Sequence, residues 1–431
     1  FILENKNIYL VPCLGFLAII LVGWIFLMMP ICHNGKCSIF DSLFTAVSAT
    51  CVNGLLTVDL SQEYTFIGQV TIAIITEIGA IGFVTFISFI LSFNRKKMTL
   101  SETLLLSSAL NDTKYGKLKQ KLKEVIQYTI IIQIIGSLFL AVYFVPKFGW
   151  KQGVWYSIFH SITAFCNAGF DLFGNTSLVE FANNVYINIV LIILMILGGI
   201  GYFVIEDIIR CIKKKSFIHI ELHTKIVLAT TLIIYLISII LIKISEPNLT
   251  ICELLFTVVT ARTTGFSTID MGKTNVMTKI IISILMLIGG APGSTSGGIR
   301  ITSIAILALT VHATLRNKKD IVVFYKKIDM QTIRQAITNI VISCVIVTIA
   351  IFGFSMVQDL SLDRILFMCS SAFSATGLTV TNVGELGIVS KLILGILMFI
   401  GRVGPISILS IFILNKNENS NIKYVSGNVM L

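Results

Sequence analysis

Long apolar segments separated by short polar connections extend along the whole chain. Seven stretches consist almost entirely of hydrophobic residues, and most are long enough to cross a bilayer or half of one. They are residues 8–29, 125–145, 187–205, 226–242, 278–288, 337–356 and 392–400. We therefore expect membrane helices, of which residues 8–29 form the first.

A second pattern recurs within the first. Four times, a run of small residues rich in Ser, Thr and Ala ends in glycine between two apolar segments, at residues 48–54, 163–169, 260–265 and 371–377. The glycines at the ends of these runs are spaced about a hundred residues apart. Four copies flanked by membrane-length segments predict four pore loops from one chain around one axis.

Each repeat is expected to contain a helix, a short pore helix with its loop, and a second helix. The expected segments are 8–29, 38–49 and 67–93; 122–145, 151–165 and 188–211; 222–244, 248–261 and 276–315; and 332–357, 362–373 and 388–414. Ser38 and Asp41 stand where capping residues belong, at the start of the first pore helix. The loops require a shared aqueous axis, because irregular backbone at membrane depth is tolerated only where it is buried or lines water.

This layout predicts an all-α membrane protein with four tandem helix–pore loop–helix repeats around one central pore. It has eight membrane crossings and four re-entrant loops. The predicted repeats are residues 1–93; 94–211, which begin with a basic linker; 212–315; and 316–431, which end in a tail.

The glycines suggest how such a pore could bind a cation. A dehydrated cation needs carbonyl oxygens pointed inward, and glycine cheaply adopts the backbone angles that turn carbonyls toward an axis. The candidate potassium filter consists of Val52, Asn53, Gly54, Asn167, Ala168, Gly169, Thr263, Thr264, Gly265, Ala375, Thr376 and Gly377. Only one glycine recurs per repeat, so we expect a looser filter than that of a strict potassium channel. The alternative, small-residue contacts between helices, would not need the irregular segments that follow at 55–60 and 266–270.

A glycine-rich stretch interrupts the apolar run of the third repeat. It contains Gly289, Gly290, Ala291, Pro292, Gly293, Ser294, Thr295, Ser296, Gly297 and Gly298. A continuous helix cannot be built from this composition, and the stretch lacks the Gly-Lys-Ser/Thr ending of a phosphate-binding loop. We expect a flexible loop that lies across the pore beneath the filter and acts as a gate, because broken helices mark ion pathways.

Three charged residues within apolar segments need individual interpretations. Arg402, between Gly401 and Gly404, is the strongest functional candidate: it could form a barrier in the pore lining or pair with loop carbonyls. Arg262 is expected to donate hydrogen bonds to pore-helix ends. Glu77 is expected to pair with a Lys or Arg, or to face a partner subunit.

Composition and charge fit a membrane protein and exclude several other classes. Hydrophobic residues make up 55% of the chain and charged residues 13%, against about 25% charged in a typical soluble domain. The net charge is +11, and the positive charge is concentrated in three connections, at residues 95–123, 210–225 and 316–334. This asymmetry predicts cytoplasmic termini and contact with anionic lipid rather than nucleic acid. No nucleophile–base pair, metal triad or organic-cofactor loop indicates an enzyme, but a carrier with an occluded site stays an alternative.

The four single-glycine motifs, the loop at 289–298 and the segment Gly401-Arg402-Val403-Gly404-Pro405 resemble the superfamily of bacterial Trk and Ktr potassium uptake subunits and plant HKT transporters. The resemblance covers nearly the whole chain. Among the branches, the chain looks most like KtrB, the membrane subunit of the Ktr potassium uptake system. The filter differs from the family's common Val-Thr-Gly at Asn53, where the backbone carbonyl is kept.

The resemblance implies a function and partners. It implies potassium uptake across the bacterial plasma membrane, with K⁺ as the transported ion, possible Na⁺ dependence, and a multi-pass chain with cytoplasmic termini. A homodimer on a cytoplasmic ring of KtrA-like nucleotide-binding subunits is also implied. The matching residues are the four filter glycines, the loop at 289–298 as the gate, and Arg402 near the pore and gate. The alternatives are a TrkH-like cation symporter and a less selective sodium/potassium carrier.

Overall fold

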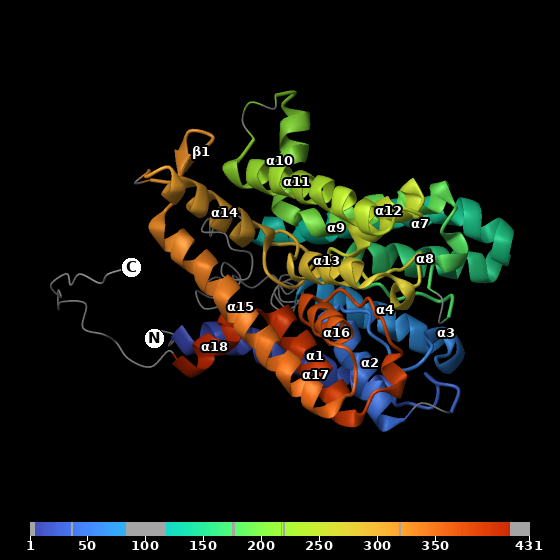
Figure 1. The fold of residues 1–431 in the computed structure, drawn as a ribbon. Coiled ribbons are helices and arrows are strands. Elements are labelled where there is room, and N and C mark those ends of the chain that lie inside the picture. Colours follow the sequence, from blue (N-terminus) through green and yellow to red (C-terminus); the bar gives the residue numbers. More distant parts are fainter. Residues whose placement is uncertain are drawn as a thin grey trace.

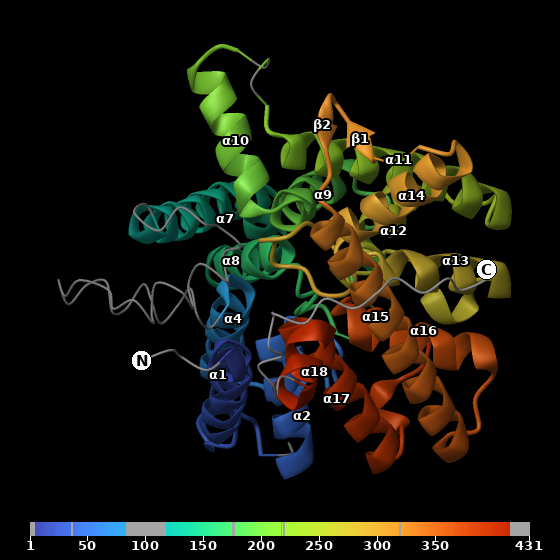
Figure 2. The same ribbon diagram turned by 90° about the vertical axis from the view of Figure 1, so that its left-hand side faces the viewer.

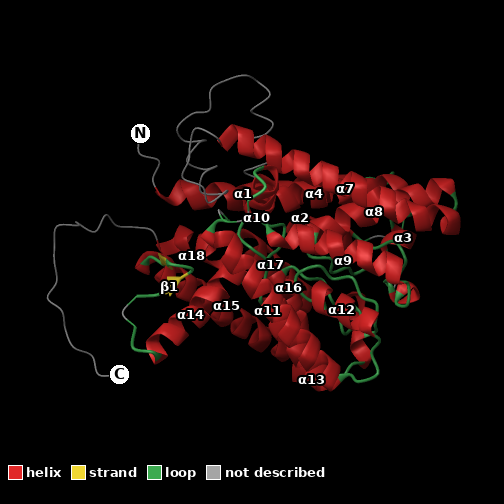
Figure 3. Ribbon diagram, turned by 90° about the horizontal axis from the view of Figure 1, so that it is seen from above, coloured by secondary structure: helices red, strands yellow, loops and turns green. Residues whose placement is uncertain are grey.

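The computed structural model describes residues 5–413, apart from 36–37, 83–117, 175–176, 217, 219 and 319. Almost all of its regular structure is helical (Figure 1). The only strands among the described residues, β1 (Val322–Val323) and β2 (Lys326–Lys327), form a short antiparallel hairpin (Figure 3). The prediction of an all-α membrane protein is therefore confirmed at the level of the fold class.

One order of helices occurs four times along the described chain: a long apolar helix, a shorter helix, an irregular segment, and a second apolar helix. The long helices are α1 (Asn5–Leu27), α7 (Leu118–Phe148), α11 (Leu222–Ser245) and α15 (Met330–Val357). The shorter helices are α2 (Ile39–Cys51), α8 (Trp150–Cys166), α12 (Ile251–Thr260) and α16 (Leu362–Ser374). The second apolar helices are α4 (Phe66–Ile81), α9 (Val185–Ile200), α13 (Val276–Leu287) and α17 (Ile388–Val403).

Further helices connect or extend these elements. The segment α3 (Leu60–Glu63) and the 3-10 turns η2 (Val179–Phe181), η3 (Met271–Lys273) and η4 (Val383–Glu385) lie between the shorter helices and the second apolar helices. Within the described ranges, three helices follow the second apolar helices: α10 (Tyr202–Lys213), α14 (Ile301–Leu315) and α18 (Pro405–Ile413).

The four groups of helices close into a ring. Each second apolar helix packs against the shorter helix of the next group, in the pairs α4–α8, α9–α12 and α13–α16. The last one, α17, packs against α2 of the first group and closes the circle. In Figure 2 the groups follow one another around a common centre in chain order, from blue through green and yellow to red.

The long helices have faces suited to lipid. Four described helices are long and apolar enough to cross a membrane, or up to six spans if each bent helix pair counts as one. In α11 and α15 only 22% of the most apolar window is buried inside the protein. A soluble protein rarely exposes apolar faces of this extent, whereas a bilayer covers them. The eight crossings expected from the sequence stay a prediction.

Local sequence explains where the shorter helices begin. The Ser38 hydroxyl accepts the Asp41 N–H at 3.0 Å, as expected of a capping residue at the start of α2. At α12, Thr250 and Glu253 form a capping box in which each side chain accepts the other residue's backbone N–H. These caps fix the direction in which each short helix enters the protein.

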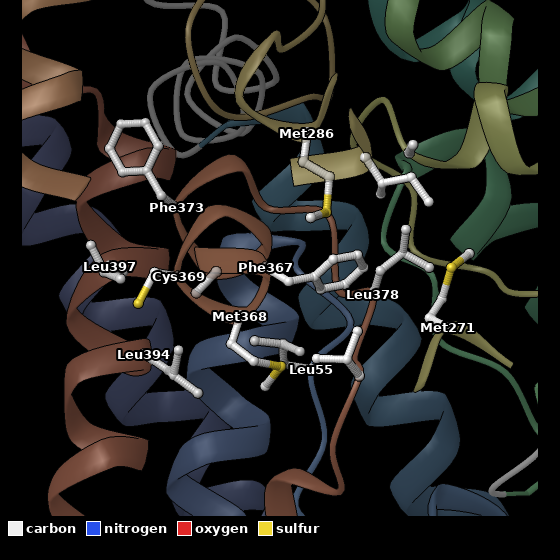
Figure 4. Close-up of a cluster of buried hydrophobic side chains, with 14 of the residues drawn as sticks. Leu55, Met271, Met286, Phe367, Met368, Cys369, Phe373, Leu378, Leu394 and Leu397 are labelled. Atoms are coloured by element: carbon white, nitrogen blue, oxygen red, sulfur yellow. The ribbon is translucent and has the colours of Figure 1, made fainter. Parts of the chain in front are cut away.

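The inner ends of the short helices are embedded in apolar packing. The largest core cluster joins α16 to α13, α17 and the irregular segments of the first and third groups. Figure 4 shows Phe367, Met368 and Cys369 of α16 among Leu55, Met271 and Leu394, all buried. This packing holds the short helices rigidly behind the irregular segments that follow them.

Two of the second apolar segments are broken rather than continuous, which corrects the expectation for residues 188–211 and 388–414. The helices α9 and α10 meet at 102°, and α17 and α18 meet at 94°. The breaks fall at Gly201 and Gly404, whose φ angles of +94° and +100° a right-handed helix cannot contain. The interruption between α13 and α14 lies where the glycine-rich stretch predicted it.

Candidate functional site

The short helices end in a tight reversal at their inner ends. Val52, Asn167 and Ala375 cap α2, α8 and α16 in the left-handed conformation. The capping N–H and the next N–H bond back to the last turn in the Schellman pattern. After α12 the left-handed residue is Thr263, with φ +75°, two positions before the glycine as in the other groups. Each of the four segments therefore turns sharply just before its recurrent glycine.

The four recurrent glycines, which we call the glycine ring, lie against one another's backbones. Their φ angles are +95°, +66°, +101° and +87° for Gly54, Gly169, Gly265 and Gly377. A carbon atom added at Gly54 would overlap the carbonyl oxygen of Ala168, the residue just before the next glycine.

The same contact repeats around the circle. An added carbon at Gly169 would meet the Thr264 carbonyl, one at Gly265 would meet the Thr376 carbonyl, and one at Gly377 would meet the Asn53 carbonyl. The contacts follow chain order and return to the start. The four segments predicted from the sequence are therefore brought together around one axis, and no side chain fits at the glycine positions.

Side chains next to the glycine ring form hydrogen bonds that hold its backbone in place. The Asn53 amide donates to the carbonyls of Ser371 and Ala372 at 3.2 and 3.0 Å, so it ties the first segment to the last. The Asn167 amide group lies between the hydroxyls of Thr264 and Thr295, at 2.7 and 3.0 Å. The eight non-glycine residues of the candidate filter are at most 1% exposed. Their backbone geometry is thus held by packing and hydrogen bonds.

A cavity of about 720 Å³ opens on one side of the glycine ring. All four glycines line it, together with residues of the irregular segments that include Asp59, Asp171 and Asp270. Lys273 also lines the cavity and lies 3.2 Å from the Asp270 carboxylate. Burial raises the pKa of the Asp171 carboxyl to about 6, against hydrogen bonds from the Phe173 N–H and the Ser177 side chain. Sequence analysis did not single out these acids, because only the fold brings them to one cavity.

The glycine-rich loop, residues 289–298, lies against the ring segments. Ser296 contacts the Thr263 hydroxyl at 2.6 Å, and an added carbon at Gly297 would lie 2.9 Å from the Ser374 carbonyl. A bridge between Ile288 and Ile299 joins the two ends of the loop. Its position next to the ring is the one predicted from the sequence, whereas its proposed gating stays a prediction.

Three buried or half-buried guanidinium groups bind carbonyls of this loop and its flanks. Arg402 donates to the Thr295 carbonyl, and also to the Gly79 and Ala80 carbonyls at the end of α4. It thus connects the loop to the first group of helices. Pairing with loop carbonyls was one of the two expectations for this residue.

The other two guanidinium groups belong to Arg262, whose contact differs from the expected one, and to Arg300, which was not predicted from the sequence. Arg262 donates to the Gly289 carbonyl at 3.1 Å, which corrects the expected contact with pore-helix ends. Arg300 donates to the Ser296 carbonyl at 3.0 Å. It was not predicted from the sequence, although a charge two residues after a glycine-rich stretch inside an apolar run was the available signal.

Glu77 is held by neutral partners, which corrects its expected pairing with a Lys or Arg, whereas the alternative that it faces a partner subunit stays a prediction. Its carboxylate accepts the Gln133 amide at 2.8 Å and the Cys166 thiol at 3.1 Å. Cys166 is the last residue of α8, directly before Asn167. The contact therefore ties α4 and α7 to the end of a short helix.

Comparisons with known proteins agree with this architecture. The family model described as "TrkH: Cation transport protein" matches residues 18–424. The Ktr system potassium uptake protein B of Bacillus subtilis is 36% identical over 97% of this chain and 95% of its own length. The potassium/sodium uptake protein NtpJ of Enterococcus hirae is 34% identical, over 97% and 95%.

A solved structure shows the same fold. The potassium transporter TrkH from Vibrio parahaemolyticus superposes with a TM-score of 0.75, covering 95% of this chain and 85% of that chain, at 16% sequence identity. At this identity the likeness concerns the fold. The ring of helices is thus found in a second protein of very different sequence.

Proposed function

Because this chain belongs to the TrkH family of cation transport proteins, we propose that it takes up potassium through a pathway along the axis of the glycine ring. Membership in a transport family agrees with the prediction that the chain is not an enzyme. The Bacillus relative is named a potassium uptake protein, and the Enterococcus relative a potassium/sodium uptake protein. These names support potassium as the transported ion.

The observation that carries the proposal is the closed sequence of contacts between glycines and neighbouring carbonyls. Carbonyl oxygens that surround an axis can replace the hydration shell of a cation. We assign this role to the twelve residues named as the filter. The four groups of helices then act as tandem repeats with the boundaries expected from the sequence.

The acidic cavity and the glycine-rich loop act at the two ends of the ring. Asp59, Asp171 and Asp270 outnumber Lys273 around the cavity, and this excess of carboxylates attracts cations to one end of the ring. At the other end, residues 289–298 close the pathway, and Arg402 fastens them to α4. Opening then requires the loop to leave these contacts while the ring stays in place.

The proposal extends to the membrane and to partners. We propose that the chain is a multi-pass protein of the bacterial plasma membrane, with cytoplasmic termini and the cavity facing outward. It forms a homodimer that docks a KtrA-like nucleotide-binding ring through its basic inner face, for which the names of the Ktr system relatives give support. Na⁺ dependence is part of the proposal.

Flux measurements on the purified chain in liposomes test this function. We expect rubidium or potassium influx that exceeds sodium influx and that external sodium stimulates. Equal rates for potassium and sodium would favour the less selective carrier, for which the likeness to a potassium/sodium uptake protein is the supporting observation. Absence of any cation flux from correctly inserted protein would refute the proposal.

A further inference from the structure

The break between α9 and α10 is seated directly against the tip of the glycine-rich loop. The Tyr202 N–H donates to the Gly293 carbonyl at 3.0 Å, and the Ala291 N–H donates back to the Gly199 carbonyl at 3.1 Å. A carbon added at Gly201 would lie 2.9 Å from the Pro292 carbonyl oxygen. The loop tip and the helix break thus share a short stretch of paired backbone.

A side chain adds to this contact. The Phe203 ring covers the open side of Gly293, where an added carbon would lie 2.7 Å from the ring. Tyr202 and Phe203 are the first two residues of α10. The first turn of α10 therefore holds the loop tip by one hydrogen bond and by van der Waals contact.

The other end of α10 is fastened to α11. Asp207 is 1% exposed and accepts both the Arg210 guanidinium and the Glu221 N–H, the latter at 2.9 Å. Arg210 also pairs with the Glu221 carboxylate at 2.8 Å. A helix of 12 residues, roughly 18 Å long, is thus tied at one end to the loop tip and near the other to the start of α11.

The break between α17 and α18 lacks this backbone contact, and so does the glycine that ends α4. Gly404, at the break between α17 and α18, would meet only the Ser407 hydroxyl, at 3.6 Å. Gly82, at the end of α4, has nothing within 4 Å of an added carbon among the described residues. All three glycines have φ angles between +88° and +100°. Backbone contact with the loop tip is therefore found at the break of the second group, whereas the end of α17 reaches the loop through the Arg402 side chain.

We propose that α10 is a brace that holds the loop across the pathway, with Tyr202 and Phe203 as positioning residues and Asp207 as the anchor. This inference rests on the proposed gating by the loop. Movement of the Arg210 end of α10 is transmitted along the helix to Gly293. A partner or ligand that moves α10 would therefore also move the tip of the gating loop.

A proline at position 202 tests the hydrogen bond. Tyr202 is the first residue of α10, where proline is well tolerated, and the ψ of +145° at Gly201 suits a residue before proline. Tyr202→Pro removes the N–H, while the matched variant Tyr202→Ala keeps it and removes the ring. In liposomes we expect potassium flux of Tyr202→Pro to exceed that of Tyr202→Ala about fivefold, the effect of one ordinary hydrogen bond on a two-state equilibrium. The potassium-to-sodium preference should not change, because the ring is untouched.

A double-mutant cycle separates the brace from the gate. Removal of residues 293–296 should raise flux by itself, and Tyr202→Pro should add nothing in that background, because both changes act on one contact. If the shortened loop raises flux and Tyr202→Pro does not, the brace is wrong and the gate stands. If neither raises flux, both are wrong, and additive effects would also overturn the brace. Should Tyr202→Pro not insert, Gly201→Ala perturbs the same contact through its overlap with Pro292. Gly404→Ala, at a similar φ but without that overlap, is its control for backbone strain.

Discussion

At the scale of single residues, the candidate pathway depends on positions where a side chain has no room. The ring glycines combine a positive φ with direct contact to a neighbouring backbone carbonyl. Backbone atoms cannot move aside as a flexible side chain can, so the overlap must displace the carbonyl itself. Repetition in the sequence was sufficient to predict these four positions.

Substitution of a ring glycine by serine should weaken potassium binding more than it weakens folding. Gly54→Ser and Gly265→Ser should raise the KM for potassium uptake at least about tenfold, because displacement of a packed backbone group costs about 1–3 kcal/mol. Gly35→Ser is the control, since Gly35 has a φ of +91° but nothing within 4 Å of an added carbon. An unchanged KM in both ring variants would contradict the assignment.

Arg402 allows a test of what the buried cation does. Its guanidinium reaches carbonyls on the loop and on α4 at once, a geometry that a lysine ammonium cannot reproduce. If the connection closes the pathway, Arg402→Gln and Arg402→Lys should both raise maximal flux, by about tenfold for the loss of hydrogen bonds to a charged group. Flux that rises in the Gln variant alone would mean that the positive charge, and not the connection, forms the barrier.

Other residues could not be placed from the sequence, for identifiable reasons. Glu77 was expected to pair with a Lys or Arg or to face a partner subunit, and within the chain the fold provides an amide and a thiol from two other helices. Asp59, Asp171 and Asp270 lie far apart in the chain and meet only at the cavity. Contacts of this kind depend on tertiary structure, which local patterns do not contain.

At the scale of elements, apolar length predicted the helices well and their breaks poorly. A glycine three positions before Gly82, Gly201 and Gly404 packs against the last turn of a short helix: Gly79 against Thr50, Gly198 against Phe165, and Gly401 against Phe373. The spacing Gly-x-x-Gly thus occurs at the ends of α4, α9 and α17. This spacing did not predict a helix end at Gly201 or Gly404, because high hydropathy continues past both glycines in the sequence.

The packing glycines should be critical for folding. Gly79→Ala and Gly198→Ala would each place a carbon on a backbone carbonyl and push two helices apart, at a cost of about 1–3 kcal/mol. We expect a lower midpoint of thermal unfolding in detergent for both variants. Gly395→Ala on α17 is the control, since an added carbon there meets nothing within 4 Å. Equal midpoints for all three variants would show that the close approach is not needed.

At the scale of the whole molecule, the sequence predicted that the four groups surround one axis, but not the contacts that close the circle. The sequence indicated four loops around one axis, but not which helices would seal the first group to the last. The structure places α17 against α2, and Asn53 bonds to the end of α16. Asn53, the residue that departs from the family's common motif, is therefore part of the seal between the chain's two ends.

The face that carries α10 and the β1–β2 hairpin provides the last test, which concerns the proposed nucleotide-binding partner. The hairpin projects from the helices (Figure 2), and Lys318 and Lys326 near it are exposed. If a partner docks there, the double reversal Lys318→Glu with Lys326→Glu should reduce co-purification of a KtrA-like protein and abolish the effect of nucleotide on flux. The ratio of potassium to sodium flux should stay the same, because the reversed charges lie away from the ring. Lys151→Glu, an exposed reversal at the start of α8, should leave both readouts unchanged. Nucleotide sensitivity in liposomes that contain this chain alone would show that no such partner is required.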